Sequence, residues 1–260
     1  MHKFFLTNKP LGLTPLEALE HLRREKGIGA DVPMTYAGRL DPMAEGLLLI
    51  LVGDECKIKD QYLGLDKEYE IEVLLGVSSD TGDVLGKIKR QDDSVSNYSP
   101  QHFSEQIIQE KITSLIGKRT EKYPAYSSKP VNGKPLFMYA REVALGGENF
   151  NDIDMPEKEI EIYSIDFCGA YVISKEKSLE TVLERILKVK GDFRQEEIIN
   201  SWKQTLEGKV IREQFQIIKL KVKSSSGAYM RTLAEKLGES LGVHALAWSI
   251  KRTKIGDFGL

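Results

Sequence analysis

Six consecutive apolar residues, Leu47–Val52, lie between Gly46 and Gly53 and constrain the fold more than any other segment of the sequence. An apolar run of this length bounded by glycines predicts a buried β-strand. A second strand is predicted over residues 68–75, where alternate side chains are apolar or aromatic and share one face. Shorter strands are expected at residues 4–7 and 217–222, and the proline-containing segment 119–135 is expected to be irregular or an edge strand.

Helix signals are interspersed with these strands. Thr14 can cap a helix, Pro15 suits its first turn, Glu17 completes a capping box, and Gly27 is a natural end. Further helices are predicted near residues 100–116, 178–190, 195–207 and 230–241. This order predicts a single α+β domain over residues 1–260, with a helical insertion at about 170–212.

The composition excludes several classes of protein. Of the 260 residues, 41% are apolar and 29% are charged, as in ordinary globular domains, and no apolar run approaches the length of a transmembrane helix. The first residues lack the pattern of a signal peptide, and Cys56 and Cys168 form no CxxC pair. A cytoplasmic location is therefore expected.

Charge is distributed unevenly, although the net charge is only −2. Residues 142–166 hold eight acidic residues and one basic residue, whereas residues 217–254 hold eight basic and two acidic residues. Two interpretations remain open, a basic face that binds a polyanion or two ordinary solvated surfaces. The charge pattern alone favours the second.

Patterns for common cofactors and metals are missing from the sequence. It has no Walker-type phosphate loop and no GxSxG motif, and the GxG at residues 27–29 follows a predicted helix instead of a strand. The four histidines lie far apart and lack the spacing of metal ligands. An enzyme with this sequence is expected to work with side chains alone.

The segment before the buried strand contains a lone aspartate followed by a proline, Asp41-Pro42. By itself this pair predicts a cap or a turn, with Asp41 bonded to backbone N–H groups. The whole segment Gly38–Leu48 also resembles the catalytic motif of pseudouridine synthases of the TruB family. Four further segments resemble motifs of this family in the same order: Lys9–Gly12, Lys67–Gly86, Pro124–Arg141 and Ser226–Thr253.

The resemblance implies the pseudouridine synthase fold, with a mixed, mostly antiparallel central sheet flanked by helices. It also implies cofactor-free isomerisation of uridine to pseudouridine at position 55, in the T-arm of tRNA. Such chemistry needs a flipped-out base and an ionised carboxylate that acts as nucleophile or as base. By resemblance the carboxylate is Asp41, and Tyr69 and Arg231 are the other catalytic residues. The implied partner is tRNA, bound by a monomer with no membrane attachment and no small-molecule cofactor.

The catalytic candidates also have ordinary structural interpretations. Tyr69 could stack on the base and relay a proton, or it could be a core aromatic. Arg231 could pair with Asp41 or be a surface cation, although a cation in the first turn of a helix opposes the helix dipole. The choice between the two roles of Asp41 stays open.

A second group of residues is implied to bind RNA. Lys9 and Lys129 could contact phosphates or stay solvated, and the backbone at Ser226 and Gly227 could bind a phosphate or simply lead into a helix. The full group implied by the resemblance is Lys9, Tyr36, Arg39, Lys129, Arg141, Ser226 and Gly227.

The sequence departs from the family's pattern in three places. Tyr36 stands where bacterial members usually carry a histidine thought to help flip the base, although a tyrosine could still wedge or stack. The sequence is expected to lack the small RNA-binding PUA domain of many relatives. Arg141 and Arg231 lie 90 positions apart, roughly double the family's usual spacing, and the helical insertion fits this gap. It could contact tRNA, act as a packing appendage or bind a partner.

The leading prediction is therefore a tRNA pseudouridine synthase. A synthase that acts on ribosomal RNA is the first alternative, because Arg39-Leu40-Asp41 also resembles the motif of that group. A non-catalytic RNA-binding or tRNA-folding protein on the same scaffold is the second. The presence of Asp41, Tyr69 and Arg231 argues against the non-catalytic alternative.

Overall fold

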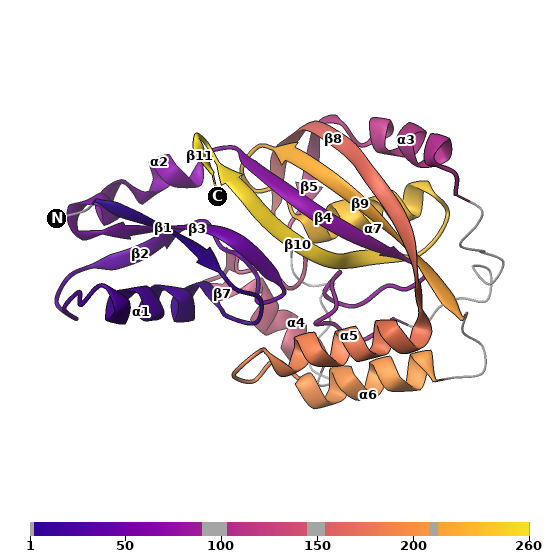
Figure 1. Ribbon diagram of the computed structural model, residues 1–260. Helices are drawn as coiled ribbons and strands as arrows, with labels where there is room; N and C mark the ends of the chain where they lie inside the picture. The colour runs from indigo at the N-terminus through magenta and orange to yellow at the C-terminus, as the bar shows by residue number, and fades with distance from the viewer. Residues whose placement is uncertain (1–2, 90–102, 145–153, 208–212, 260) are drawn as a thin grey trace.

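A computed structural model describes residues 3–89, 103–144, 154–207 and 213–259 (Figure 1). Its centre is a nine-stranded sheet in the order β1-β3-β10-β4-β9-β8-β5, with β2 paired to β3 and β11 paired to β10. Its strands are β1 (Phe4–Lys9), β2 (Met34–Ala37), β3 (Ala44–Val52), β4 (Lys67–Leu75), β5 (Gly117–Lys122), β8 (Glu157–Ser174), β9 (Gln214–Ser224), β10 (Ala245–Ile255) and β11 (Phe258–Gly259). A separate ribbon consists of β6 (Pro130–Val131) and β7 (Lys134–Pro135).

Helices surround the sheet and confirm the expected α+β class. They are α1 (Pro15–Glu25), α2 (Lys59–Leu63), α3 (Glu105–Ser114), α4 (Leu136–Ala144), α5 (Lys175–Leu187), α6 (Gln195–Leu206) and α7 (Met230–Ser240), with a 3₁₀ turn at Gly53–Ile58. The predicted capping box of α1 is present, with Thr14 and Glu17 bonded to each other's backbone N–H. In the described part of the chain, none of these helices is long and apolar enough to cross a membrane.

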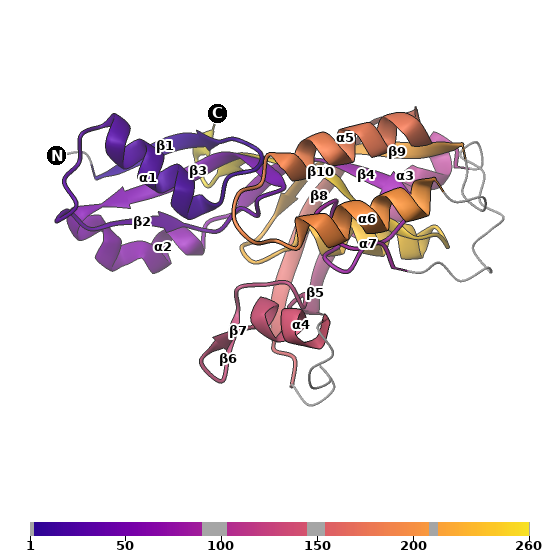
Figure 2. The ribbon, with the colours of Figure 1, turned by 90° about the horizontal axis from the view of Figure 1, so that it is seen from below.

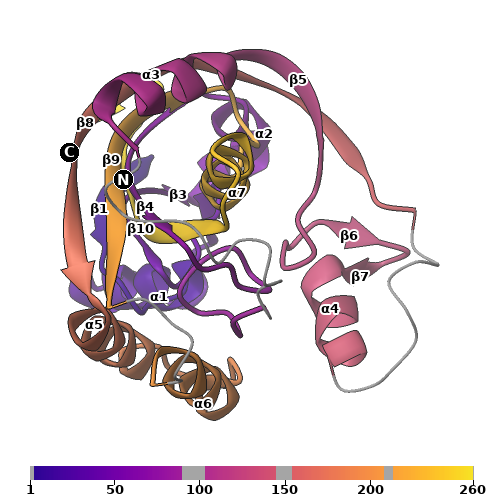
Figure 3. The ribbon, with the colours of Figure 1, turned by 90° about the vertical axis from the view of Figure 1, so that its right-hand side faces the viewer.

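The two faces of the sheet are covered by different helices. α7 lies within the curve of the sheet, with α3 beside it, and packs on alternate residues of β4, β9 and β10 (Figure 3). On the opposite face, α5 and α6 cover one end of the sheet, where Trp202 packs with Phe215 and Trp248. α4 and the β6–β7 ribbon project away from the sheet (Figure 2). The alternation predicted over residues 68–75 is confirmed, since Tyr69, Ile71, Val73 and Leu75 all belong to the core on the α7 side.

The helical insertion begins later in the chain than the sequence predicts. Residues 170–174 belong to β8, because the chain continues in strand pairing with β9 until Ser174 caps α5. The two helices then run over Lys175–Leu187 and Gln195–Leu206, so the predicted pair exists with its first helix displaced toward the N-terminus. Residues 208–212 and the loop predicted at 91–100 lie outside the described residues.

A short parallel seam joins the N-terminal strands to the rest of the sheet. β3 and β10 pair in parallel at only three positions, from Ala44–Ile250 to Gly46–Arg252, while the other pairings of the described strands are antiparallel. Gly46 has a φ of +107°, and a Cβ added there would lie 2.2 Å from the carbonyl oxygen of Arg252. Only glycine permits this backbone approach. The mixed, mostly antiparallel sheet expected from the family is confirmed.

Much of the basic C-terminal segment lies on the sheet surface that faces away from α7. Lys219 and Lys221 on β9 and Lys251 and Lys254 on β10 pair with glutamates of β4 at 3.8–4.0 Å. These pairs are long and partly exposed, so each contributes little stability. The interpretation as a solvated surface holds for these lysines, whereas Arg231 and Arg252 turn inward.

Candidate active site

A four-residue turn presents Asp41 directly before β3. The N–H of Ala44 donates to the carbonyl oxygen of Asp41 at 2.9 Å, with Pro42 in the second position that proline favours in such turns. The turn is tied to the N-terminal segment by a hydrogen bond from the Gly12 N–H to the Pro42 carbonyl oxygen (2.8 Å). The turn expected from the sequence is present, but no helix follows it and the carboxylate has a different partner from the expected backbone N–H groups.

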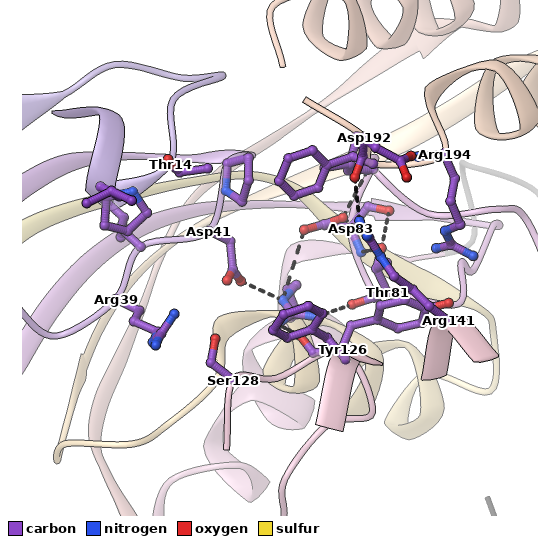
Figure 4. A pocket seen from close by; sticks show the side chains of 18 of the residues that line it. Thr14, Arg39, Asp41, Thr81, Asp83, Tyr126, Ser128, Arg141, Asp192 and Arg194 are labelled. Carbon is purple, nitrogen blue, oxygen red and sulfur yellow. Dashed lines mark hydrogen bonds and ion pairs between the residues drawn. The ribbon is translucent and has the colours of Figure 1, made fainter. Parts of the chain in front are cut away.

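That partner is Arg231, in the first turn of α7. Its Nε donates to Oδ2 of Asp41 at 2.8 Å, its Nη1 to the Thr81 carbonyl oxygen at 2.5 Å and its Nη2 to the Tyr126 carbonyl oxygen at 3.1 Å. The Arg231 side chain is 4% exposed, whereas the Asp41 side chain is 40% exposed. The buried guanidinium of Arg231, bonded at all three nitrogens, therefore orients the Asp41 carboxylate, which remains accessible to a ligand (Figure 4).

A second carboxylate, Asp83, lies behind this pair. Its Oδ2 is 4.0 Å from Nε of Arg231, and its Oδ1 accepts hydrogen bonds from the Thr81 hydroxyl and the Leu85 N–H. Burial raises the pKa of Asp83 to about 6, against the opposing effect of Arg231. Burial lowers the pKa of Arg231, but the two carboxylates raise it by more, so the net shift is upward and the guanidinium stays charged.

Two pockets meet at Asp41. The Tyr69 pocket, about 420 Å³, is lined by Tyr69, Tyr229 and a group of cations; the Tyr36 pocket, about 450 Å³, extends toward α1, α4 and the loop before α6. Arg39, Asp41 and Arg231 line both pockets. Figure 4 shows the Tyr36 pocket, with Asp41 and Arg39 on one side and Arg141, Asp192 and Arg194 on the other.

The Tyr69 pocket is strongly cationic. Six cationic side chains line it against the single carboxylate of Asp41: Arg39, Lys67, Lys129, Lys158, Arg231 and Arg252. Burial lowers the pKa of Lys67 to about 8, and the neighbouring charges of Arg252 and Lys158 add to this shift. Burial and the charge of Lys129 also lower the pKa of Lys158. A bound anion would reduce the electrostatic repulsion between these neighbouring cations.

The structure brings nine of the ten candidate residues to these pockets. The Tyr69 pocket has Tyr69, Lys129, Ser226 and Gly227 on its wall, the Tyr36 pocket has Tyr36 and Arg141, and the remaining three line both. Lys9 is the exception. It is fully buried, and its ammonium donates to the carbonyl oxygens of Pro10 (3.1 Å) and Leu13 (2.7 Å). The prediction of a phosphate or water at Lys9 does not fit this environment.

Several lining residues were not singled out from the sequence. Tyr229 lies in the Tyr69 pocket, where burial and the Asp41 carboxylate raise its pKa to about 12. Asp83 and Tyr126 stood within segments that resemble family motifs, so position in the motif was an available signal. Lys158 lies on β8 within the acidic segment, where nothing in the sequence pointed to the site. Arg194 belongs to the helical insertion and had no sequence signal either.

Comparison with known proteins identifies the family. The sequence model described as "TruB family pseudouridylate synthase (N terminal domain)" matches residues 30–184, more than half of the chain. The chain belongs to this family. The matched segment includes Asp41, Asp83 and Tyr126, while Arg231 lies beyond its end.

Curated relatives in the TruB family extend the similarity over nearly the whole chain. Proteins named tRNA pseudouridine synthase B from Aromatoleum aromaticum and Xanthomonas euvesicatoria pv. vesicatoria are 28% and 29% identical over 98% and 99% of the chain. The chain spans 63% and 65% of the lengths of these two relatives. The relative of the same name from Chloroherpeton thalassium is 28% identical, and the chain covers 85% of it.

Solved structures share the fold of this TruB family member. A chain in the "Crystal Structure of a Cbf5-Nop10-Gar1 Complex" aligns over 99% of this chain and 50% of its own length, with a TM-score of 0.57 and 15% identity. A chain in the "Structure of H/ACA RNP bound to a substrate RNA containing 2'-deoxyuridine" aligns over 99% and 48%, with a TM-score of 0.53 and 14% identity. At this identity the likeness concerns the fold alone.

Proposed function

We propose that this chain isomerises uridine to pseudouridine in tRNA, without a cofactor and with Asp41 as the reacting carboxylate. The observation that carries the proposal is the Arg231–Asp41 pair at the junction of two pockets. A buried guanidinium bonded to three oxygens fixes a carboxylate whose other oxygen is available, because only Oδ2 accepts from Arg231. The isomerisation breaks the bond from the sugar C1′ to N1 of the base and forms a bond from C1′ to C5, while C5 loses its proton and N1 gains one. Asp41 acts as nucleophile toward the sugar or as the base that removes a sugar proton.

The Tyr69 pocket supplies the environment for a flipped-out nucleotide. Tyr69 offers a ring to stack on the base, and its hydroxyl is a candidate proton relay. Six cations around one carboxylate suit a phosphate-bearing ligand, and the buried Lys67 among them favours an anion because Asp41 is the one carboxylate among the described lining residues. Lys129, Arg39 and the turn at Ser226 and Gly227 are the proposed contacts to the RNA backbone of this nucleotide.

The Tyr36 pocket is the proposed contact for the neighbouring part of the RNA. Tyr36 lies beneath Arg39 and Lys59, whose charged groups are 6.0 and 5.4 Å from its ring centre. Arg141 faces the same pocket from α4. In this position Tyr36 can take the wedging role for which the family usually carries a histidine.

The substrate is proposed from the relatives. Their name, tRNA pseudouridine synthase B, supports tRNA over ribosomal RNA, and the T-arm with position 55 is the target that the family resemblance implies. We propose that the protein acts as a monomer, since residues of one chain line both pockets. We also propose that it acts in the cytoplasm, where its two free cysteines, Cys56 and Cys168, would stay reduced.

The test is incubation of the purified protein with an unmodified tRNA transcript, followed by mapping of pseudouridine. We expect one modified uridine in the T-arm with the wild-type chain and none with Asp41→Asn. Binding of tRNA at fixed salt should be nearly unchanged in the variant, because it keeps the shape of the turn. Asp54→Asn is a matched control, since this carboxylate is exposed and pairs with the exposed Lys57.

Each outcome separates the candidate functions. Full activity in Asp41→Asn would remove Asp41 from the mechanism. A wild-type chain that modifies only ribosomal RNA would replace the tRNA proposal by the first alternative. Tight tRNA binding without any pseudouridine would support a non-catalytic role on the same scaffold.

A further inference from the structure

The helical insertion forms part of the wall of the Tyr36 pocket. The loop between α5 and α6 contributes Asp192, Phe193 and Arg194 to its lining. Figure 4 shows Asp192 and Arg194 across the pocket from Asp41. The same loop passes close to the N-terminal segment, since a Cβ added to Gly12 would lie 2.7 Å from the carbonyl oxygen of Lys188. The insertion is therefore built into the site, and its helices are not merely an appendage on the sheet.

Local hydrogen bonds hold this loop in one conformation. The side chain of Gln195 accepts from the Phe193 N–H (2.9 Å) and donates to the carbonyl oxygen of Gly191 (2.7 Å). The Asp192 carboxylate accepts from the Arg194 N–H (3.2 Å). Arg194 itself has a φ of +62°, a left-handed conformation that is costly for a residue with a Cβ. Such a conformation persists only where surrounding contacts fix it.

The side chain of Arg194 fixes two separate segments of the site. Its Nη1 is 2.8 Å from Oδ2 of Asp80, and its guanidinium lies 4.8 Å from the ring centre of Tyr126. The Tyr126 hydroxyl also donates to Oδ2 of Asp80, at 3.1 Å. The Arg194 side chain is only 10% exposed and the Asp80 side chain 26%, so this three-residue contact is partly shielded from water.

These two segments are the ones that hold Arg231. The carbonyl oxygen of Tyr126 accepts from Nη2 of Arg231, and Thr81, which follows Asp80 in the chain, accepts from Nη1. Arg194 thus contacts the ring of Tyr126, whose own carbonyl oxygen bonds to Arg231. It also contacts Asp80, the residue before Thr81, whose carbonyl oxygen is the other backbone acceptor of Arg231. The connection passes from the insertion through Tyr126 and Asp80 to Arg231, and from there to Asp41.

We propose that Arg194 is a positioning residue for the Arg231–Asp41 pair, through which the helical insertion controls the geometry of the active site. The inference rests on the proposed function, because its readout is pseudouridine formation. Arg194 acts here through protein groups. The competing role, direct contact between Arg194 and RNA, would affect binding of the substrate instead of the chemical step.

The test compares Arg194→Ala, Arg194→Lys and the matched control Lys203→Ala in the full chain. Lys203 is an exposed cation of α6, on the same insertion and outside both pockets. We expect Arg194→Ala to lower the single-turnover rate roughly tenfold or more, because small displacements of catalytic groups have large effects on rate. Affinity for tRNA transcript should stay unchanged. Arg194→Lys should restore part of the rate, since an ammonium can keep the ion pair with Asp80, and Lys203→Ala should match wild type.

Coupling to Asp80 provides the second measurement. If Arg194 acts through Asp80, Asp80→Asn should lower the rate on its own, and the double variant with Arg194→Ala should be no slower than the slower single variant. Thermal unfolding of every variant establishes that the rates are those of folded protein, and Asp80→Asn keeps the test decisive if Arg194→Ala does not fold.

The failures of the two proposals are distinguishable. A wild-type chain without activity on tRNA contradicts the proposed function. An active wild type with an equally fast Arg194→Ala overturns the positioning role. So does an Arg194→Ala variant that loses tRNA affinity while its rate at saturating tRNA is unchanged, because that result assigns Arg194 to RNA contact. If the fold-losses in rate of Arg194→Ala and Asp80→Asn multiply in the double variant, the two residues act independently, and the positioning role is also overturned.

Discussion

The start of α7 and the end of β1 each bury a cation near the Asp41 turn, but the two cations have different partners. Arg231 bonds to the partly exposed carboxylate of Asp41 as well as to two carbonyl oxygens. Lys9 bonds to two carbonyl oxygens and borders neither pocket. Burial lowers the pKa of Lys9 to about 8, whereas the carboxylates beside Arg231 give its pKa a net upward shift. The Asp41 carboxylate also opposes the effect of burial on the pKa of Lys9, but the hydrogen bonds of the Lys9 ammonium go to carbonyl oxygens. Arg231 therefore orients Asp41 through direct bonds, whereas Lys9 bonds to the backbone of the N-terminal turn.

The sharpest test of this comparison is Arg231→Lys. A lysine has one ammonium group and cannot place donors on Asp41, Thr81 and Tyr126 in the planar arrangement of a guanidinium. We expect the rate of pseudouridine formation to fall by about 100-fold, as for a displaced catalytic group, with little change in tRNA affinity. Arg23→Lys is the control, because Arg23 also bonds to two carbonyl oxygens but lies away from both pockets. An equal loss of rate in Arg231→Lys and Arg23→Lys would contradict the proposed role of Arg231 in the site.

A smaller effect is expected from titration of Asp83. Its pKa is raised from 3.8 to about 6 in the folded protein, so between these values the folded state binds more protons and stability falls as pH rises. Below about pH 6 the protonated group no longer attracts Arg231, and we expect the rate to decline. Asp83→Asn should be slower at neutral pH and should lack this part of the profile. A pH–rate profile with the same acidic limb in both proteins would assign that limb elsewhere.

Lys9→Met should change stability and leave the chemistry alone. Methionine fills a similar volume but leaves the carbonyl oxygens of Pro10 and Leu13 without their donor, a cost of about 1–3 kcal/mol for each buried group. We expect a lower midpoint of chemical unfolding and an unchanged rate per folded molecule. In the wild type, the contribution of Lys9 to stability should increase between about pH 8 and 10.5, where the unfolded state binds the extra proton. A rate loss as large as that of Arg231→Lys would erase the distinction between the two cations.

The sequence predicts the local elements and the Asp41–Arg231 pair well, for different reasons. The strand at Leu47–Val52, the alternation from Tyr69 to Leu75 and the capping box at Thr14 follow from local periodicity and hydrogen bonding, which neighbouring residues determine. Asp41 and Arg231 are 190 positions apart, and no local rule connects them. Their pairing could be predicted only because each lies in a segment that resembles a family motif.

Other features depend on tertiary contacts that the sequence does not display. Lys9 follows a polar residue and precedes a turn, a context typical of solvated lysine, yet carbonyl oxygens from the following turn surround it. Arg194 stands in a helical insertion of mixed charge, and its significance arises from Asp80 and Tyr126, which lie 114 and 68 positions earlier in the chain. The first helix of the insertion begins at Lys175 instead of residue 178, because Ser174, the last residue of β8, caps it directly.

The seam between β3 and β10 has a consequence for how the proposed catalytic pair, Asp41 and Arg231, is spaced. Asp41 reaches the site from the β3 side of this seam and Arg231 from the side of the larger sheet, and the two sides pair directly at three positions. The backbone of Arg252 lies where a methyl group on Gly46 would have to be. A chain with alanine at this position could retain every charged residue of the active site and still hold its carboxylate out of alignment with the arginine. The close approach of β3 to β10 at Gly46 therefore requires a residue without a side chain. The alignment of Asp41 with Arg231 depends on that approach.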